Sequence, residues 1–331
     1  MPHEIAEWSE ISEQFKDSLL LGNGASIAID DSFLYKSLKE HAIEHGLLTA
    51  NVQALFTYFN TDDFELVLRL VWQASRVNKA LDISDSKTQS AYEHVRDCLI
   101  GAVRDIHPLY SDVEHQFDDV ANFLSQFKTV LSLNYDLTLY WVAMYSNRQG
   151  TGHIFKDAMY HGVLDDDWKK YRQLYRENSN TLIFYPHGNL MFARNIIDNE
   201  FKIEVGDHND LLDAIFNNWS YENCVPMFVS EGTSNQKVVS ITNSHYLSVT
   251  YREVFSDLGN TLTIYGWGFG EHDVHILRRL RATNVTKLAV SVYGRDQGYC
   301  NHVYELIKQE LGRVEVLFFD STSRGCWNSP A

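Results

Sequence analysis

The sequence predicts an α/β fold, a Rossmann-like doubly wound parallel sheet of about six strands. Short apolar runs alternate with stretches of helical periodicity, which is the pattern of alternating strands and helices. The runs are continuously rich in apolar residues, as is typical of strands buried on both faces of a parallel sheet. The first run leads into a glycine turn, Gly22-Asn23-Gly24-Ala25-Ser26, at the place where nucleotide-binding sheets hold a pyrophosphate.

Six runs rich in Val, Ile, Leu, Phe and Thr are predicted as strands. They are Ser18–Leu21, Thr129–Leu133, Thr181–Tyr185, Thr261–Tyr265, Lys287–Val292 and Val314–Phe319. Apolar residues recur at helical spacing between several of them. These helical stretches are Leu66–Ala74, Val113–Phe127, Val274–Leu280 and Val303–Leu311.

The chain is predicted to form a single domain over residues 1–331, with no internal repeat. Residues 32–126 have helical periodicity and no convincing strand, so they are expected to form a helical insertion after the first strand. This insertion either packs on the sheet or covers the site as a lid. Residues 127–320 then supply the main part of the sheet.

Composition narrows the classes of partner and ligand. The chain has 28 basic and 44 acidic residues, a formal charge of −16, which argues against direct nucleic-acid binding. No apolar run approaches the length of a membrane span, and the polar N-terminal segment is unlike a signal peptide, so a cytoplasmic protein is expected. The four cysteines form no C-x-x-C pair, and no metal site is predicted.

Polar or glycine-rich segments follow four of the predicted strands. Because ligands of open α/β sheets bind at the carboxyl ends of the strands, these segments are expected to meet at one edge. They are Gly22–Ser26, Asn134-Tyr135-Asp136, Pro186-His187-Gly188-Asn189, and Gly266–Asp273, which contains Trp267, Gly268 and Glu271.

Each segment also has a purely structural interpretation. The glycine turn lacks the third glycine of the dinucleotide fingerprint, since Ile27 stands there, and it could be an ordinary strand–helix corner. Asn134 and Asp136 could cap the helix that begins near Leu137. His187 could be a core histidine. Glu271 and Asp273 could cap the next helix.

The ordered set of strand-GNGAS, strand-LNYD, strand-YPHGN and strand-GWGFGEHDVHI resembles the sirtuin-like NAD-binding superfamily over about Leu19–Phe319. The segment from Pro226 to Thr233, with Tyr246-Leu247, resembles a bacterial branch whose relatives occur in anti-phage defence. Deacetylase sirtuins carry a four-cysteine zinc module, and the cysteine spacing here does not match it. The resemblance therefore implies hydrolysis of NAD rather than protein deacylation.

The resemblance implies roles for individual residues around NAD, which is the substrate and the only cofactor expected. Asn134 would bind the ribose or position water, and His187 would act as general base. Asp136 would orient Asn134 or the nicotinamide amide, or stabilise the developing positive charge. The pyrophosphate turn would comprise Gly22, Asn23, Gly24, Ala25 and Ser26. The remaining NAD contacts would come from Tyr135, Gly188, Gly266, Trp267, Gly268, Glu271 and Asp273.

The function expected on this basis is that of an NAD glycohydrolase, a defence effector that depletes cellular NAD. Three alternatives stay open: a sensor that binds NAD or ADP-ribose without hydrolysis, a partner subunit with a vestigial site, and an ADP-ribosyltransferase. Free NAD hydrolysis would harm the cell. Control by homo-oligomerisation or by a separate regulatory protein is therefore also expected.

Overall fold

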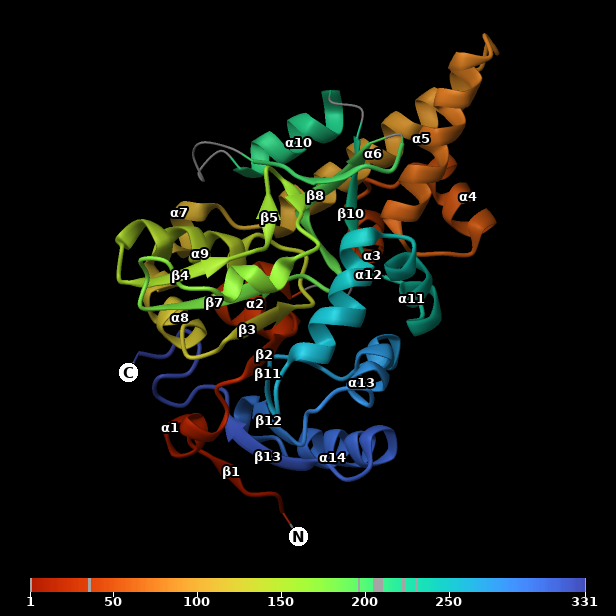
Figure 1. The fold of residues 1–331 in the computed structure, drawn as a ribbon. Coiled ribbons are helices and arrows are strands. Elements are labelled where there is room, and N and C mark those ends of the chain that lie inside the picture. Colours follow the sequence, from red (N-terminus) through yellow and green to blue (C-terminus); the bar gives the residue numbers. More distant parts are fainter. Residues whose placement is uncertain are drawn as a thin grey trace.

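The computed structural model describes residues 2–34, 37–195, 197–204, 211–221, 224–229 and 231–330. Its centre is an eight-stranded sheet, entirely parallel, in the order β1-β13-β12-β11-β2-β3-β7-β4 (Figure 1). The strands are β1 (Ile5–Ala6), β2 (Ser18–Leu21), β3 (Thr129–Ser132), β4 (His153–Lys156), β7 (Ser179–Phe184), β11 (Thr261–Tyr265), β12 (Lys287–Val292) and β13 (Glu315–Asp320).

The six predicted strands are all present, and the predicted fold class is confirmed. Numbered along the chain, they lie in the spatial order three, two, one, four, five, six, which is the order of dinucleotide-binding doubly wound sheets. The strand count differs because β1 and β4 extend the two edges. The switch point, where the strand order reverses, lies between β2 and β11, with Leu20 paired to Ile264.

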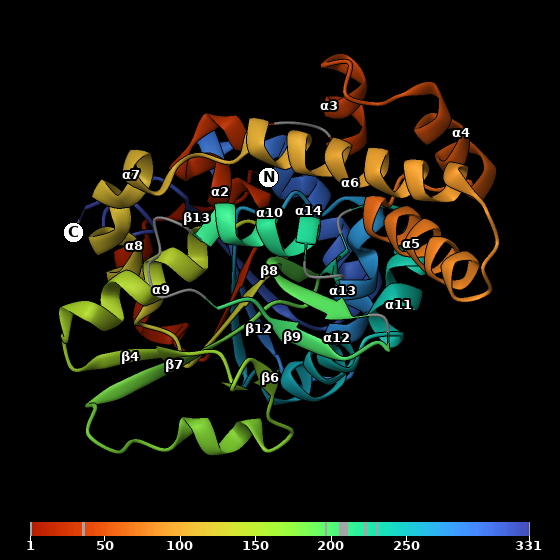
Figure 2. The same cartoon turned by 90° about the horizontal axis from the view of Figure 1, so that it is seen from above.

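Helices cover both faces of the sheet because alternate residues of each central strand point to opposite sides. Leu19 and Val130 belong to a core shared with the helices of the first half of the chain, such as α8 and α9. Leu20 and Leu131 belong to a core shared with α13 and α14. Figure 2 shows this layered arrangement from above.

The helices have the following bounds: α1 (Trp8–Ile11), α2 (Asn23–Ile29), α3 (Leu38–Glu44), α4 (Ala50–Phe59), α5 (Phe64–Ala80), α6 (Ser86–Ile106), α7 (Tyr110–Val113), α8 (Phe117–Leu124), α9 (Thr138–Gln149), α10 (Leu211–Tyr221), α11 (Ser234–Thr242), α12 (His245–Val249), α13 (Val274–Leu280) and α14 (Gln297–Leu311). A π-helical turn, η5 (Thr250–Val254), continues α12.

The described part of the 32–126 stretch is helical, as predicted, and runs from η2 (Asp31–Phe33) to α8. The helices α5 and α6 lie side by side and extend away from the sheet (Figure 1). Helical structure begins earlier than predicted, because α2 (Asn23–Ile29) precedes residue 32. This helix was missed because it is only seven residues long and buries few apolar side chains, among them Ala25 and Ile29.

A second, antiparallel sheet was not predicted from the sequence. It has the order β10-β8-β9 and consists of β8 (Gly188–Asn195), β9 (Glu200–Lys202) and β10 (Cys224–Phe228); β5 (Met159–Tyr160) and β6 (Val163–Leu164) form a separate hairpin. Strand β8 begins directly after His187, so this sheet fixes one wall of the site. Within the described residues, no helix combines the length and hydrophobicity needed to cross a membrane.

Candidate functional site

A cavity of about 350 Å³ lies at the switch point of the main sheet, between the carboxyl ends of β2 and β11. This is where open α/β sheets bind their ligands. All four predicted segments contribute to its wall. The lining residues are Gly22, Asn23, Ser37, Leu133, Asn134, Tyr135, Asp136, His187, Val229, Glu231, Lys237, Trp267, Gly268, Gly270, His272 and Asp273.

The turn after β2 and the turn after β11 are packed backbone against backbone. Gly22 donates its N–H to Tyr265 O at 2.9 Å, and Gly24 donates to Gly266 O at 2.7 Å. A Cβ on Gly22 would lie 2.5 Å from the Cα of Trp267, so a larger residue has no room. Glycine here permits close contact between the two turns. The amide of Gly24 is already used in that contact.

The segment after β3 is tied to the glycine turn through side chains. The amide nitrogen of Asn134 donates to Gly22 O and to the hydroxyl of Ser26, both at 2.9 Å. Ser26 in turn donates to the Asp136 carboxylate. The other carboxylate oxygen of Asp136 accepts the N–H of Thr138, the first residue of α9, at 2.8 Å, whereas the N-cap position itself is Leu137.

His187 lies in the turn between β7 and β8, and it is buried. Its carbonyl accepts the N–H of Val229 at 2.7 Å. The next residue, Gly188, has φ +76°, and a Cβ there would lie 2.3 Å from Met227 O. The turn is therefore pressed against the end of β10, which leaves the His187 ring little freedom.

His187 belongs to a buried polar group at one end of the cavity. Its Nε2 lies 3.0 Å from Nε2 of His275, at the start of α13. Asp273 is held by the ammonium of Lys237, which comes from α11 and lies 2.8 Å from Oδ1. Asp273 therefore pairs with Lys237, and its side chain makes no capping hydrogen bond to α13.

The charges of this group follow from its burial. Burial lowers the pKa of His187 well below its usual range, and Lys237 adds to that effect. Burial likewise lowers the pKa of His275 to about 4. For Asp273, burial alone would raise the pKa, but the neighbouring His187 and Lys237 side chains lower it to about 2. At neutral pH the site thus contains two neutral imidazoles beside a buried ion pair.

The predicted site residues, apart from Glu271, fall into two sets. Nine line the cavity: Gly22, Asn23, Asn134, Tyr135, Asp136, His187, Trp267, Gly268 and Asp273. The others, except Glu271, lie behind the wall and shape it: Gly24, Ala25, Ser26, Gly188 and Gly266. Glu271 is placed differently. It lines a wider groove of about 1390 Å³ between the helical insertion and α11, α13 and α14. Ser37, Glu231 and His272 line both the groove and the cavity.

Sequence reasoning missed three residues that build the site. His107 accepts the N–H of Leu137 on Nε2 at 3.0 Å, which places its proton on Nδ1, facing Pro108 O. It thereby holds the 134–136 segment from the helical insertion. Lys237 carries no local signal, because it lies in an ordinary helix. His275 had a signal, since it follows the predicted loop by two residues and belongs to the quoted motif GWGFGEHDVHI.

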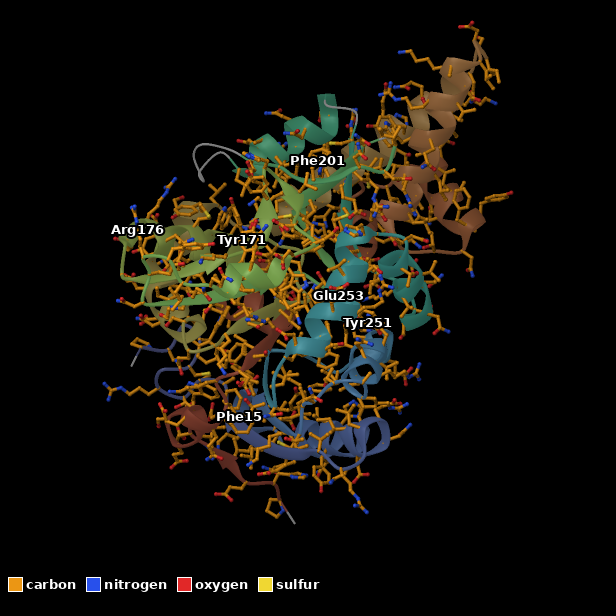
Figure 3. The ribbon with its side chains drawn as sticks, viewed as in Figure 1. Phe15, Tyr171, Arg176, Phe201, Tyr251 and Glu253 are labelled. Carbon is orange, nitrogen blue, oxygen red and sulfur yellow. The ribbon has the colours of Figure 1, made fainter. Side chains whose placement is uncertain are left out.

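His275 is also fixed by its backbone. Its N–H donates to the hydroxyl of Ser234 at 3.1 Å. Its carbonyl accepts the hydroxyl of Tyr251 at 2.9 Å; this tyrosine belongs to the π-helical turn η5 and is labelled in Figure 3. The Nδ1 of His275 is buried and has no hydrogen-bond partner within the described residues.

Comparison with known proteins gives a family and no function. No curated protein matches the chain. Residues 19–327 span all four loops of the cavity, and they match the family described as "Domain of unknown function (DUF4917)". The chain therefore belongs to the DUF4917 family.

Proposed function

We propose that this protein binds NAD at the switch point between β2 and β11 and hydrolyses the bond between nicotinamide and ribose. The observation that carries the proposal is the cavity itself. It lies at the carboxyl ends of strands arranged in the dinucleotide-binding order, and Asn134, Asp136 and His187 come together in its wall. The resemblance of the four loop sequences to sirtuin-like NAD-binding proteins supports NAD as the nucleotide.

The proposed chemistry follows from the charge that develops during cleavage. As nicotinamide leaves with the bonding electron pair, the ribose becomes oxocarbenium-like, much as in glycoside hydrolysis. The carboxylate of Asp136 would stabilise that positive charge, and the amide oxygen of Asn134 would orient the ribose or the water. Water then adds to C1′ of the ribose and loses a proton, giving ADP-ribose.

His187 is the proposed acceptor of that proton. Its low pKa keeps the imidazole neutral at pH 7, so a nitrogen lone pair is available. His275 engages Nε2, so the base would be Nδ1.

A second candidate is NAD or ADP-ribose binding without hydrolysis. The observation that favours it is that the reactive groups already have partners. The amide nitrogen of Asn134 is bound to Gly22 and Ser26, and Nε2 of His187 faces His275. A binding protein needs such fixed polar walls but no free base.

The two candidates are separated by incubating purified protein with NAD and following nicotinamide and ADP-ribose by chromatography, with calorimetry for binding. The first candidate predicts turnover that His187→Gln and Asn134→Ala each reduce by about 100-fold or more. His153→Gln, on the edge strand β4, is the matched control and should retain full activity. Retained activity in both site variants would contradict the assignment. Tight NAD binding without products would support the second candidate.

We further propose a defence role in the cytoplasm, where the enzyme would deplete NAD once released from control by self-association or by a separate regulatory protein. Light scattering coupled to size exclusion tests the self-association. A monomer with full activity at all concentrations, in the absence of any other protein, would contradict this part of the proposal.

A further inference from the structure

We propose that His187, His275 and Asp273 form a binding site for a divalent transition-metal ion such as Zn²⁺. All three residues are buried, and each offers one ligand atom. These three atoms lie within 4.8 Å of one another. Two imidazoles and one carboxylate form a ligand set that suits zinc, cobalt and iron, whereas Mg²⁺ and Ca²⁺ prefer oxygen ligands.

The distance between the two imidazoles fits metal coordination. Their Nε2 atoms are 3.0 Å apart. Two nitrogens bound to a tetrahedral ion at about 2.0–2.1 Å lie about 3.3 Å from each other. A small opening of the pair would therefore admit the ion.

The three side chains are supported independently, as ligands must be. His187 lies in a turn locked against β10 through Val229 and Gly188. His275 is held on both sides of its peptide unit, by Ser234 and Tyr251. Asp273 is held through its backbone, because its N–H donates to Gly270 O at 2.9 Å. Such outer contacts are what fixes ligand geometry in metal sites.

The site also has access to solvent and an open position. His187 and Asp273 line the 350 Å³ cavity, so an ion could enter from there. Three protein ligands leave at least one coordination position free for water or a ligand.

The positive charge of Lys237 affects the metal affinity of this site. Its ammonium shares the Asp273 carboxylate with the ion, and two cations near one carboxylate repel each other. The charge of Lys237 should therefore weaken metal binding. Replacing it by a neutral side chain of similar length should make binding tighter, which an adventitious surface site would not show.

This proposal does not depend on NAD, although the two proposals meet at His187. Coordination through Nε2 places the imidazole proton on Nδ1, which removes that nitrogen as a base. Hydrolysis that needs the ion and hydrolysis that needs His187 as a free base are thus alternatives. Turnover before and after chelation separates them, while metal binding itself is measured without NAD.

The experiment uses untagged full-length protein, stripped with a chelator and titrated with Zn²⁺ by calorimetry and with Co²⁺ by visible absorption. We expect one ion per chain, with the absorption bands of nitrogen- and oxygen-ligated Co²⁺. His275→Gln and Asp273→Asn should each weaken binding by roughly 100-fold or more. Lys237→Met should bind several-fold more tightly than the native protein.

The control is His45→Gln. The rings of His41 and His45 stack with their centroids 4.0 Å apart, so this second pair of histidines could bind metal weakly. This change should leave the affinity unaltered. Circular dichroism verifies that each variant is folded, and Lys237→Met provides a gain of binding that misfolding cannot mimic. The proposal is overturned if native protein binds neither ion at micromolar concentrations, or if His275→Gln and Asp273→Asn bind as well as the native protein.

Discussion

Gly266 occupies a position where a side chain would be both strained and in contact with backbone. Its φ is +69°, and a Cβ would lie 2.3 Å from the N of Ala25 in the opposite turn. Gly268, two residues away, lines the cavity, and nothing lies within 4 Å of a Cβ built on it. The two glycines therefore form a matched pair.

We predict that Gly266→Ala lowers the free energy of unfolding by about 2–4 kcal/mol, since it forces the β2 and β11 turns apart. Gly268→Ala should change it by no more than about 0.5 kcal/mol. Urea unfolding measures both. Equal effects of the two substitutions would mean that the contact between the turns does not stabilise the fold.

A buried glutamate side chain links two of the elements around the cavity, and the sequence did not indicate this contact. Glu231, between β10 and α11, accepts the N–H of Leu38 at the start of α3, at 2.6 Å. Burial raises the pKa of Glu231 to about 7, because the backbone donors of α3 and Lys237 offset only part of the cost of burying the charge. Asp63, the N-cap of α5, is raised to about 7 in the same way.

These shifts give the stability a defined dependence on pH. The folded state holds the Glu231 proton up to about pH 7, whereas the unfolded chain releases it near the ordinary glutamate pKa of 4.5. Between these values the folded state binds more protons, so stability falls as the pH rises. Glu231→Gln removes this contribution. We expect its stability relative to the native protein to increase between pH 5 and pH 8, by on the order of 2 kcal/mol.

Chemical unfolding at a series of pH values tests this prediction. Glu44→Gln, at an exposed position of α3, is the control and should follow the native curve. A Glu231→Gln curve parallel to the native one would show that the buried carboxyl does not titrate in this range.

Whether a strand could be predicted from the sequence depended on how deeply the strand is buried. The inner strands were found because strands covered on both faces are mostly apolar without alternation, as in β2, where three leucines follow Ser18. The edge strand β4 is only partly buried and contains both polar and apolar residues, so it was missed. The four strand-end loops could be placed together because parallel strands align their ends. Lys237 and His107 could not, because Lys237 lies in α11, His107 directly follows α6, and the packing of these helices leaves no local mark in the sequence.

For the whole molecule, the helical insertion and the sheet share one core. Trp72 of α5 and Leu99 of α6 belong to the same buried cluster as Leu19 of β2 and Val130 of β3. We therefore predict a single calorimetric transition, with equal calorimetric and van't Hoff enthalpies. A chain without residues 32–126 should fail to fold. Two separate transitions, or a folded truncated protein, would mean that the insertion is an independent domain.

The contact between the first and last parts of the chain bears on how the protein is made. Trp327 donates its indole N–H to Ala25 O at 3.0 Å, and Asn328 donates to Ala28 O at 2.7 Å, so residues near the end of the chain hold α2. Strand β2 likewise pairs with β11, which lies more than 200 residues further along the chain. During synthesis, the glycine turn is therefore made long before the residues of β11 and the 327–328 segment that pack against it. The cavity should therefore be complete only once residues 261–328 have emerged from the ribosome.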